Sequence, residues 1–176
     1  CRTVRANTTT TRPGKRGRGA ASKTPFVAAI QTNSEGKPLY IRLTPVAGFT
    51  YEALKQWSAE CLSSTARVVS DGLGCFGAVT HTAAQHERHI VGSGKSAVQR
   101  AEFRWVNTLL GNLKTAFSGT YHAFNHAKYA QRYLAEFSYR FNRRFDLAAM
   151  VPRLLRAAAT TEPLPLGILR IPETSN

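Results

Sequence analysis

Two apolar runs on either side of a short polar turn constrain the fold of this chain most. Thr24–Thr32 (TPFVAAIQT) and Pro38–Val46 (PLYIRLTPV) each have the length of a β-strand. The second run alternates apolar and polar side chains from Leu39 to Leu43. Asn33–Gly36 between the two runs has the residues that favour a tight turn. We therefore expect a β-hairpin over these residues.

Helical spacing follows the hairpin and recurs in the second half of the chain. Phe49–Leu62 begins with Thr50 as a helix N-cap, and its apolar residues Leu54, Trp57 and Cys61 recur at helical spacing. The other expected elements are short strands at Ala66–Val69 and His89–Val91 and helices at Glu102–Phe117, Ala123–Arg144 and Met150–Ala159. This order of hairpin, helix, strand and further helices predicts a mixed α/β fold.

The charge balance indicates a polyanionic partner. The chain has 24 Lys and Arg against 10 Asp and Glu, a formal net charge of +14. Such a surplus attracts nucleic acid through counterion release and long-range steering. A basic protein from a high-GC genome and a ribosomal-type binder remain alternatives. Residues 1–23 hold seven of the Lys and Arg residues and no acid, which predicts a poorly ordered basic arm.

Cysteine usage and hydropathy exclude several other classes of protein. Cys1, Cys61 and Cys75 form no CxxC pair and are odd in number, which disfavours a disulfide scaffold or a zinc ribbon and suits a reducing cytoplasm. No apolar run approaches the roughly 18 residues that span a membrane, and no hydrophobic signal region begins the chain. Because the sequence starts at Cys rather than Met, we expect a fragment.

Acidic residues are scarce, which limits where carboxylate chemistry can occur. Asp71 and Asp146 are the two aspartates, and no acid precedes Glu35. Asp71 follows the expected strand Ala66–Val69, at the strand end where ligand-handling groups collect in open α/β sheets. Asp71-Gly72 is also an ordinary turn signal, so both interpretations stay open at this point.

Asn107 and Lys114 lie on one face of the helix expected at Glu102–Phe117. They are seven residues apart, which at 3.6 residues per turn leaves them only about 20° out of phase. Gly111 lies between them and has no side chain to obstruct a bulky ligand. On one helix, a solvated Asn and Lys would explain the pattern equally well. The combination with Asp71 favours a functional site.

The spacing of these three residues resembles the second half of the DDE signature of insertion-sequence transposases. In this chain Asp71 is followed, after 35 intervening residues, by Asn107, and Lys114 comes seven positions later. Further blocks agree in order and spacing at Lys15–Thr32, Ala66–Phe76, Phe103–Phe124 and Arg132–Leu147. From Lys15 to Ala158 the chain is similar to the insertion-sequence family numbered 1595, whose catalytic set is often Asp-Asp-Asn-Lys.

The resemblance implies an RNase H-like mixed α/β sheet flanked by helices, which cleaves DNA strands and transfers them to a target. It also implies two Mg²⁺ or Mn²⁺ ions, which prefer oxygen ligands and clamp the attacking and leaving oxygens of a phosphoryl transfer. Asp71 would supply a carboxylate and Asn107 a carbonyl oxygen to the metal. Lys114 would hold a DNA phosphate or the terminal base as a point charge.

Further residues and partners follow from the same resemblance. We expect the partner to be DNA, as element ends and as target, with a homodimer in the intact enzyme. We expect the location to be the nucleoid of a bacterial cytoplasm, with no membrane. Glu136 is a secondary site candidate, although an ion pair with Arg140 one turn later explains it as well. The DNA-binding candidates besides Lys114 are Lys15, Arg16, Arg18, Lys95 and Arg104.

The sequence departs from the family at its N-terminus. The first catalytic Asp of such a core lies on the first strand, shortly before the KRGRG block, but residues 1–14 contain no acid. We therefore expect a truncated, inactive copy that lacks both a metal ligand and the central strand of the sheet. The expected organisation is a basic arm at 1–23, a partial catalytic core at 24–159 and a tail at 160–176.

Two other functions remain open. The first is a non-catalytic basic protein that coats DNA, and the second is an RNA-processing nuclease on the same fold. The His86–His89 segment lacks the spacing of a zinc-protease helix, and Gly92–Ser96 lacks the first glycine of a phosphate-binding loop. Neither motif supports a competing enzyme class.

Overall fold

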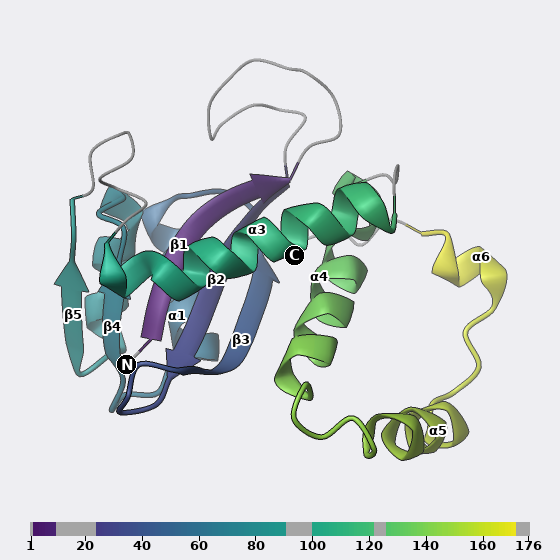
Figure 1. Ribbon diagram of the computed structural model, residues 1–176. Coiled ribbons are helices and arrows are strands. Elements are labelled where there is room, and N and C mark those ends of the chain that lie inside the picture. The colour runs from purple at the N-terminus through teal and green to yellow at the C-terminus, as the bar shows by residue number, and fades with distance from the viewer. Residues whose placement is uncertain (1, 10–23, 91–99, 122–125, 172–176) are drawn as a thin grey trace.

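The computed structural model describes residues 2–9, 24–90, 100–121 and 126–171, and its centre is one mixed β-sheet. Within these ranges five strands lie in the order β3-β2-β1-β4-β5 (Figure 1). Antiparallel pairs join β1, β2 and β3, whereas β4 runs parallel to β1 and β5 parallel to β4. The strands are β1 (Arg2–Thr9), β2 (Thr24–Thr32), β3 (Pro38–Pro45), β4 (Arg67–Ser70) and β5 (Gln85–Arg88). The predicted mixed α/β class, a sheet flanked by helices, is confirmed.

The central strand is present, so the prediction that the chain lacks it is wrong. β1 lies between β2 and β4, and it is formed by residues that the composition had assigned to a basic, poorly ordered arm. Its sequence, RTVRANTT, has no apolar stripe. A central strand needs none to form, because backbone hydrogen bonds to a neighbour on each side hold it, and Thr and Val favour extended backbone. The rest of the expected arm, residues 10–23, lies outside the described residues.

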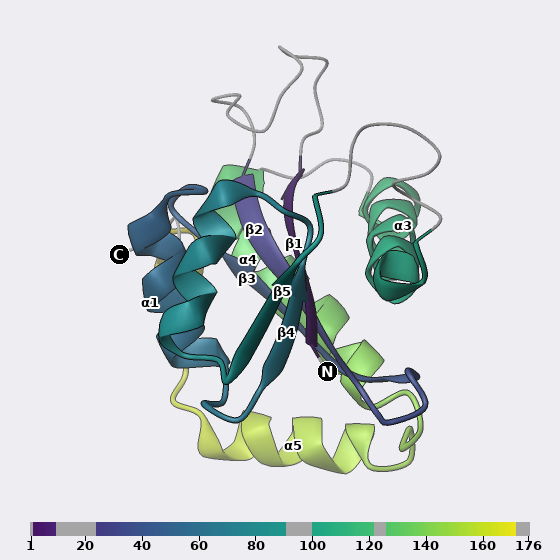
Figure 2. The same ribbon diagram turned by 90° about the vertical axis from the view of Figure 1, so that its left-hand side faces the viewer.

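Helices cover both faces of the sheet, as the edge-on view in Figure 2 shows. One core contains α1 (Tyr51–Cys61), the 3₁₀ helix η1 (Gly74–His81) and one face of the strands. The other core contains α3 (Arg104–Gly119) and α4 (His126–Asn142), and a one-turn 3₁₀ helix η2 (Ala101–Phe103) leads into α3.

The hairpin and α1 follow their predicted patterns. The continuous apolar run of β2 is buried on both faces, with Val27 in the α1 core and Phe26 and Ile30 in the α3 core. Thr50 caps α1 as predicted, because its side-chain oxygen accepts a hydrogen bond from the Ala53 backbone at 3.2 Å. The apolar α1 residues at helical spacing are buried: Leu54, Trp57 and Cys61.

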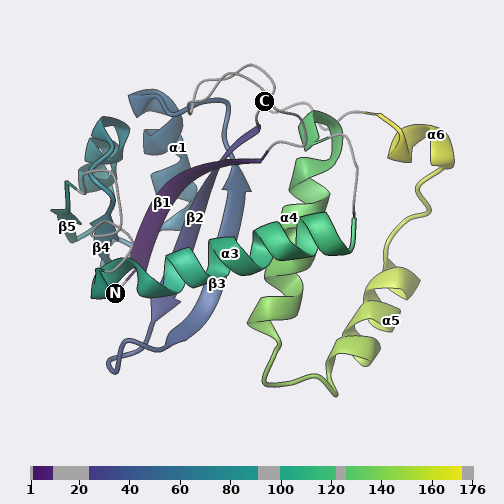
Figure 3. The same cartoon turned by 45° about the horizontal axis from the view of Figure 1, so that its top comes forward.

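The last strand and the C-terminal segment differ from the prediction. β5 occupies Gln85–Arg88 and not His89–Val91, because its pairing with β4 defines it and its own QHER sequence is polar. After α5 (Met150–Thr160), a short helix α6 (Leu166–Leu169) forms within the expected tail. Both lie on the far side of α4 from β5 (Figure 3). Within the described ranges, none of the helices has the length and hydrophobicity that crossing a membrane requires.

The end of α4 protects the open edge of β3. Asn142 accepts a hydrogen bond from the Ile41 backbone N–H at 2.8 Å and donates one to the Ile41 carbonyl at 3.0 Å. Arg144 donates to the carbonyls of Leu39 and Pro38. These side chains satisfy backbone groups that would otherwise offer an edge for pairing with another chain.

Replacing Asn142 by Ala should lower the free energy of unfolding by about 1–3 kcal/mol, because two backbone groups of an edge strand lose their partner. Chemical denaturation measures this change. Asn112→Ala, at an exposed position of α3, is the matched control and should stay within about 0.5 kcal/mol of the parent. Equal losses in the two variants would contradict the edge-protecting role.

Candidate active site

Asp71 lies directly after β4, at the end of the strand that neighbours the central strand. It is only 8% exposed, and its Oδ1 accepts a long hydrogen bond from the Leu73 backbone at 3.4 Å. Along β4, Val68 belongs to the α1 core and Val69 to the α3 core. Since side chains alternate along a strand, Asp71 continues the side of Val69, which α3 covers.

Gly72 allows the turn after Asp71 to press against the end of β5. Its φ of +80° lies in the region that favours glycine. A Cβ at this position would lie 2.7 Å from the His89 carbonyl oxygen and 2.8 Å from the Ile90 Cα. Asp71-Gly72 thus belongs to the irregular connection after β4, and this connection holds a buried carboxyl group at the sheet end.

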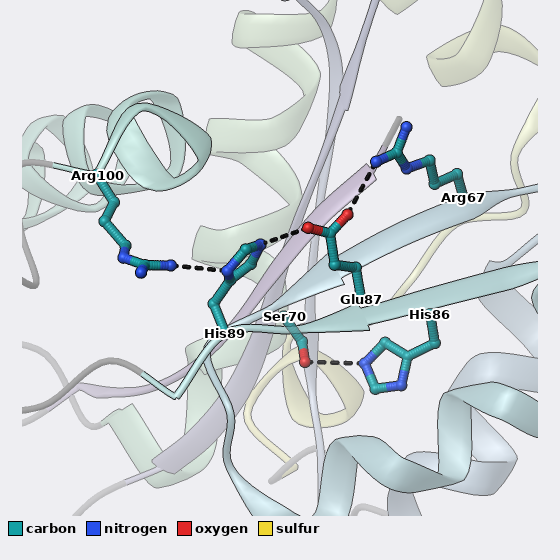
Figure 4. A network of polar contacts seen from close by, with 6 residues as sticks. All are labelled: Arg67, Ser70, His86, Glu87, His89 and Arg100. Carbon is teal, nitrogen blue, oxygen red and sulfur yellow. Dashed lines mark hydrogen bonds and ion pairs between the residues drawn. The ribbon is translucent and has the colours of Figure 1, made fainter.

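A polar network joins β4 and β5 beside this turn (Figure 4). Ser70 is fully buried, and its hydroxyl lies 2.9 Å from His86 Nε2. Burial, with a further contribution from the charge of Arg88, lowers the pKa of His86 below its usual value. His86 is therefore harder to protonate than a solvent-exposed histidine, and its Nε2 contacts a core hydroxyl group.

His89 continues the network toward α3. Its Nδ1 lies 2.7 Å from the Arg100 guanidinium, which can only donate, so Nδ1 accepts and the ring proton resides on Nε2. Nε2 lies 2.9 Å from Glu87 Oε1 (Figure 4). The other Glu87 oxygen accepts from Arg67 at 2.9 Å, and this bond is the main cause that lowers the pKa of Glu87.

This network links the end of β4 to the residue that precedes α3. The backbone N–H of His89 donates to the Ser70 carbonyl at 3.0 Å, one residue before Asp71. The His89 ring meets the edge of Phe103, the residue that precedes α3, with ring centroids 6.1 Å apart. Asn107 is one helical turn after Phe103. The turn that carries Asp71 and the first turn of α3 therefore both adjoin His89. The sequence does not predict this network, because β5 has no apolar pattern.

α3 crosses one face of the sheet (Figure 1). Asn107 is half-buried and Lys114 is exposed. At Gly111, between them, an added Cβ would meet no atom within 4 Å, so the helix surface is open there. The side of the helix that packs on the sheet consists of Val106, Leu109 and Leu113.

The other candidate residues divide into two groups. Arg104 is exposed at the start of α3, with its guanidinium 5.2 Å from the Trp105 ring. Glu136 accepts from the Tyr121 hydroxyl at 2.8 Å and pairs with Arg140 at 2.6 Å, which is the structural alternative that the sequence left open. The candidates outside the described residues are Lys15, Arg16, Arg18 and Lys95.

The residues present do not fit a two-metal centre. Asp71 would contribute one carboxylate and Asn107 one neutral carbonyl oxygen, but the central strand supplies no acid. In the part of the chain that the structure describes, no group of three or more His, Cys, Asp or Glu side chains converges. Hard divalent cations need more oxygen ligands than this set provides.

Gly72→Ala should destabilise the chain more than Gly36→Ala, although both glycines have a positive φ. An alanine at position 36 meets no atom within 4 Å and should cost only the backbone strain, about 1–2 kcal/mol. At position 72 the added Cβ would also collide with the backbone of His89 and Ile90, directly after β5. This collision should cost about 1–3 kcal/mol more, as is typical of overpacking. Urea unfolding of both variants measures the difference. Equal losses would show that the turn does not press on β5.

Comparisons with known proteins identify the family. None of the curated proteins matches the sequence. Among solved structures, the chain is similar to the catalytic core domain of BIV integrase, with a TM-score of 0.48 and 13% sequence identity, over 80% of this chain and 83% of that chain. The model of the ISXO2-like transposase domain matches residues 2–142, from the start of β1 to the end of α4. The chain therefore belongs to the ISXO2-like transposase domain family, the DDE-type family of insertion sequences numbered 1595.

Proposed function

We propose that this chain is the catalytic core of a DNA transposase, with Asp71, Asn107 and Lys114 at the site of strand cleavage and transfer. The observation that supports this most is the joint position of Asp71 and the first turn of α3 beside His89. A protein that only coats DNA has no need of a buried carboxyl group at the sheet end beneath a helix that presents Asn and Lys.

DNA would lie along the open surface of α3. Lys114 is exposed there, and Gly111 leaves room for a bulky ligand. Arg104 adds a second cation at the start of the helix. These side chains would position the phosphate backbone and would not read the base sequence.

We also propose that the chain as it stands is inactive. In the family, phosphoryl transfer would use Mg²⁺ or Mn²⁺ held by carboxylates, with DNA ends and target DNA as partners, in a homodimer associated with the bacterial nucleoid. Here β1 carries no carboxylate. The residues of this chain would then bind and orient DNA without completing the reaction.

The lack of a carboxylate on β1 also favours a second candidate function, a non-catalytic DNA-binding protein. A chain with a net charge of +14 and an incomplete metal site can still bind duplex DNA. The two candidates differ in where DNA binds. The transposase core predicts the α3 face, whereas a coating protein would use its cations without regard to face.

DNA binding should weaken steeply with salt, and Lys114→Ala should reduce the slope of log K against log salt by about 1. Fluorescence anisotropy with a labelled duplex at several salt concentrations measures both quantities. Lys55→Ala is the control, because Lys55 is exposed on α1 at the opposite face. An equal effect of the two substitutions would favour the coating protein, and binding indifferent to salt would refute the basic-surface argument.

The purified chain should give no strand-transfer product with element-end DNA in Mg²⁺ or in Mn²⁺, since a two-metal site that lacks a carboxylate should not support the reaction. Gel analysis of labelled DNA tests this. Metal-dependent product that disappears in Asp71→Asn would refute the proposed inactivity while supporting the site.

A further inference from the structure

The α5–α6 segment, residues 150–171, leaves its apolar side chains in solvent. The structure describes all of these residues, and none of them is buried. Near one end of the segment, the Arg132 guanidinium of α4 donates to the Leu169 carbonyl at 2.7 Å. Near the other end, the Tyr139 hydroxyl of α4 donates to the Met150 carbonyl at 3.4 Å. These bonds tether the segment to α4 by its backbone and leave its apolar side chains exposed.

α5 has an apolar stripe on one side and cations on the other. At about 100° per residue, Arg153 and Arg156 lie on the side of the helix opposite the stripe. The stripe consists of Val151, Leu154, Leu155 and Ala158. A helix of 11 residues is marginal in water by itself and draws its stability in a protein from the packing of its apolar face. The stripe of α5 therefore needs a partner.

The exposed apolar surface of the described chain is concentrated in and just before this segment. Of fourteen exposed large apolar side chains, ten lie from Phe145 onward. The other four are separated from one another: Leu39 and Tyr40, which point to opposite faces of β3, Tyr51 on α1 and Ile90 after β5. Within the described residues, the surface of a second copy that matches the stripe of α5 is therefore the same stripe.

We propose that the α5–α6 segments of two copies of this chain pack against each other about a two-fold axis, with the α5 stripe at the centre. Such a contact is isologous, so one patch serves both copies. The α5 arginines point away from it, so two chains with a net charge of +14 each can meet there. A homodimer is part of the proposed function, and the inference rests on that function in this respect alone.

The apolar area is sufficient for a small dimer interface. Eight large apolar side chains of the segment are 37–65% exposed. They offer on the order of 400 Å² of apolar area per copy. Since roughly 60% of an interface is apolar, covering them in both copies would bury on the order of 1,300 Å² in total, at the lower end of stable complexes.

The test is sedimentation equilibrium of the full chain over a range of concentrations. The parent should form a dimer at about 100 µM, as suits an interface of this size. Leu155→Gln should raise the dimer dissociation constant on the order of 100-fold, because each dimer loses two leucine side chains from the contact. Leu154→Gln should act in the same way. Higher salt should strengthen the dimer, because it screens the repulsion between two cationic chains.

Arg156→Gln is the matched control, because it introduces the same side chain at the next position, on the opposite side of the helix. It should change the dissociation constant by less than about 3-fold. Because Leu155 is exposed in the single chain, Leu155→Gln should keep the melting temperature of the dilute, monomeric parent.

Three results would overturn the inference. The first is a parent that stays monomeric at that concentration, and the second is a dimer that Leu154→Gln and Leu155→Gln leave intact. The third is a monomeric parent that binds vesicles of phosphatidylcholine and phosphatidylglycerol through Leu155, since the stripe would then serve a membrane surface.

Failure of the proposed function has a separate signature. The family model matches residues 2–142, so the α5–α6 segment lies outside the domain that carries Asp71, Asn107 and Lys114. A monomeric chain whose DNA binding still depends on Lys114 would refute the dimer contact alone. A dimer sensitive to Leu155→Gln whose DNA binding shows no preference for the α3 face would refute the transposase assignment alone.

Discussion

The parallel pairing of β1 with β4 is the constraint on which the rest of the molecule depends. β1 is the one strand with the antiparallel hairpin on one side and the parallel strands on the other. Its register with β4 sets which residue of the central strand stands beside Asp71. A shift of one residue would move every side chain of β1 to the other face of the sheet. Backbone hydrogen bonds in a strand of polar sequence therefore join the two halves of the sheet.

The edge strand β5 has a positioning role. Glu87 of β5 accepts from Arg67 of β4 and faces His89, which directly follows β5 and accepts from Arg100 at the approach to α3 (Figure 4). The ring contact with Phe103 adds an apolar element to this connection. Because Phe103 directly precedes α3, His89 contacts the start of the helix that carries Asn107.

The block Arg132–Leu147, which resembles the family in sequence, makes contacts that stabilise the fold. Asn142 and Arg144 bind the backbone of β3, and Glu136 pairs with Arg140 while it accepts from Tyr121. Burial, followed by the bond to Glu136, raises the pKa of that tyrosine. Polar residues in this block thus protect a sheet edge and hold Tyr121, which follows α3, against α4.

The sequence by itself determined the elements whose side chains carry a periodic pattern: the hairpin from Thr24, the α1 helix with its Thr50 cap, and the helix that presents Asn107 and Lys114 on one side. Local spacing suffices to predict these elements, because the apolar residues of each pattern pack into the core. Tertiary structure alone decided the two polar strands, β1 and β5, since hydrogen bonds from β4 and β2 hold them whatever their side chains. It also decided that Val4 of β1 pairs with Ser70 of β4, because strand register is a property of the paired backbones and is not written in either segment alone.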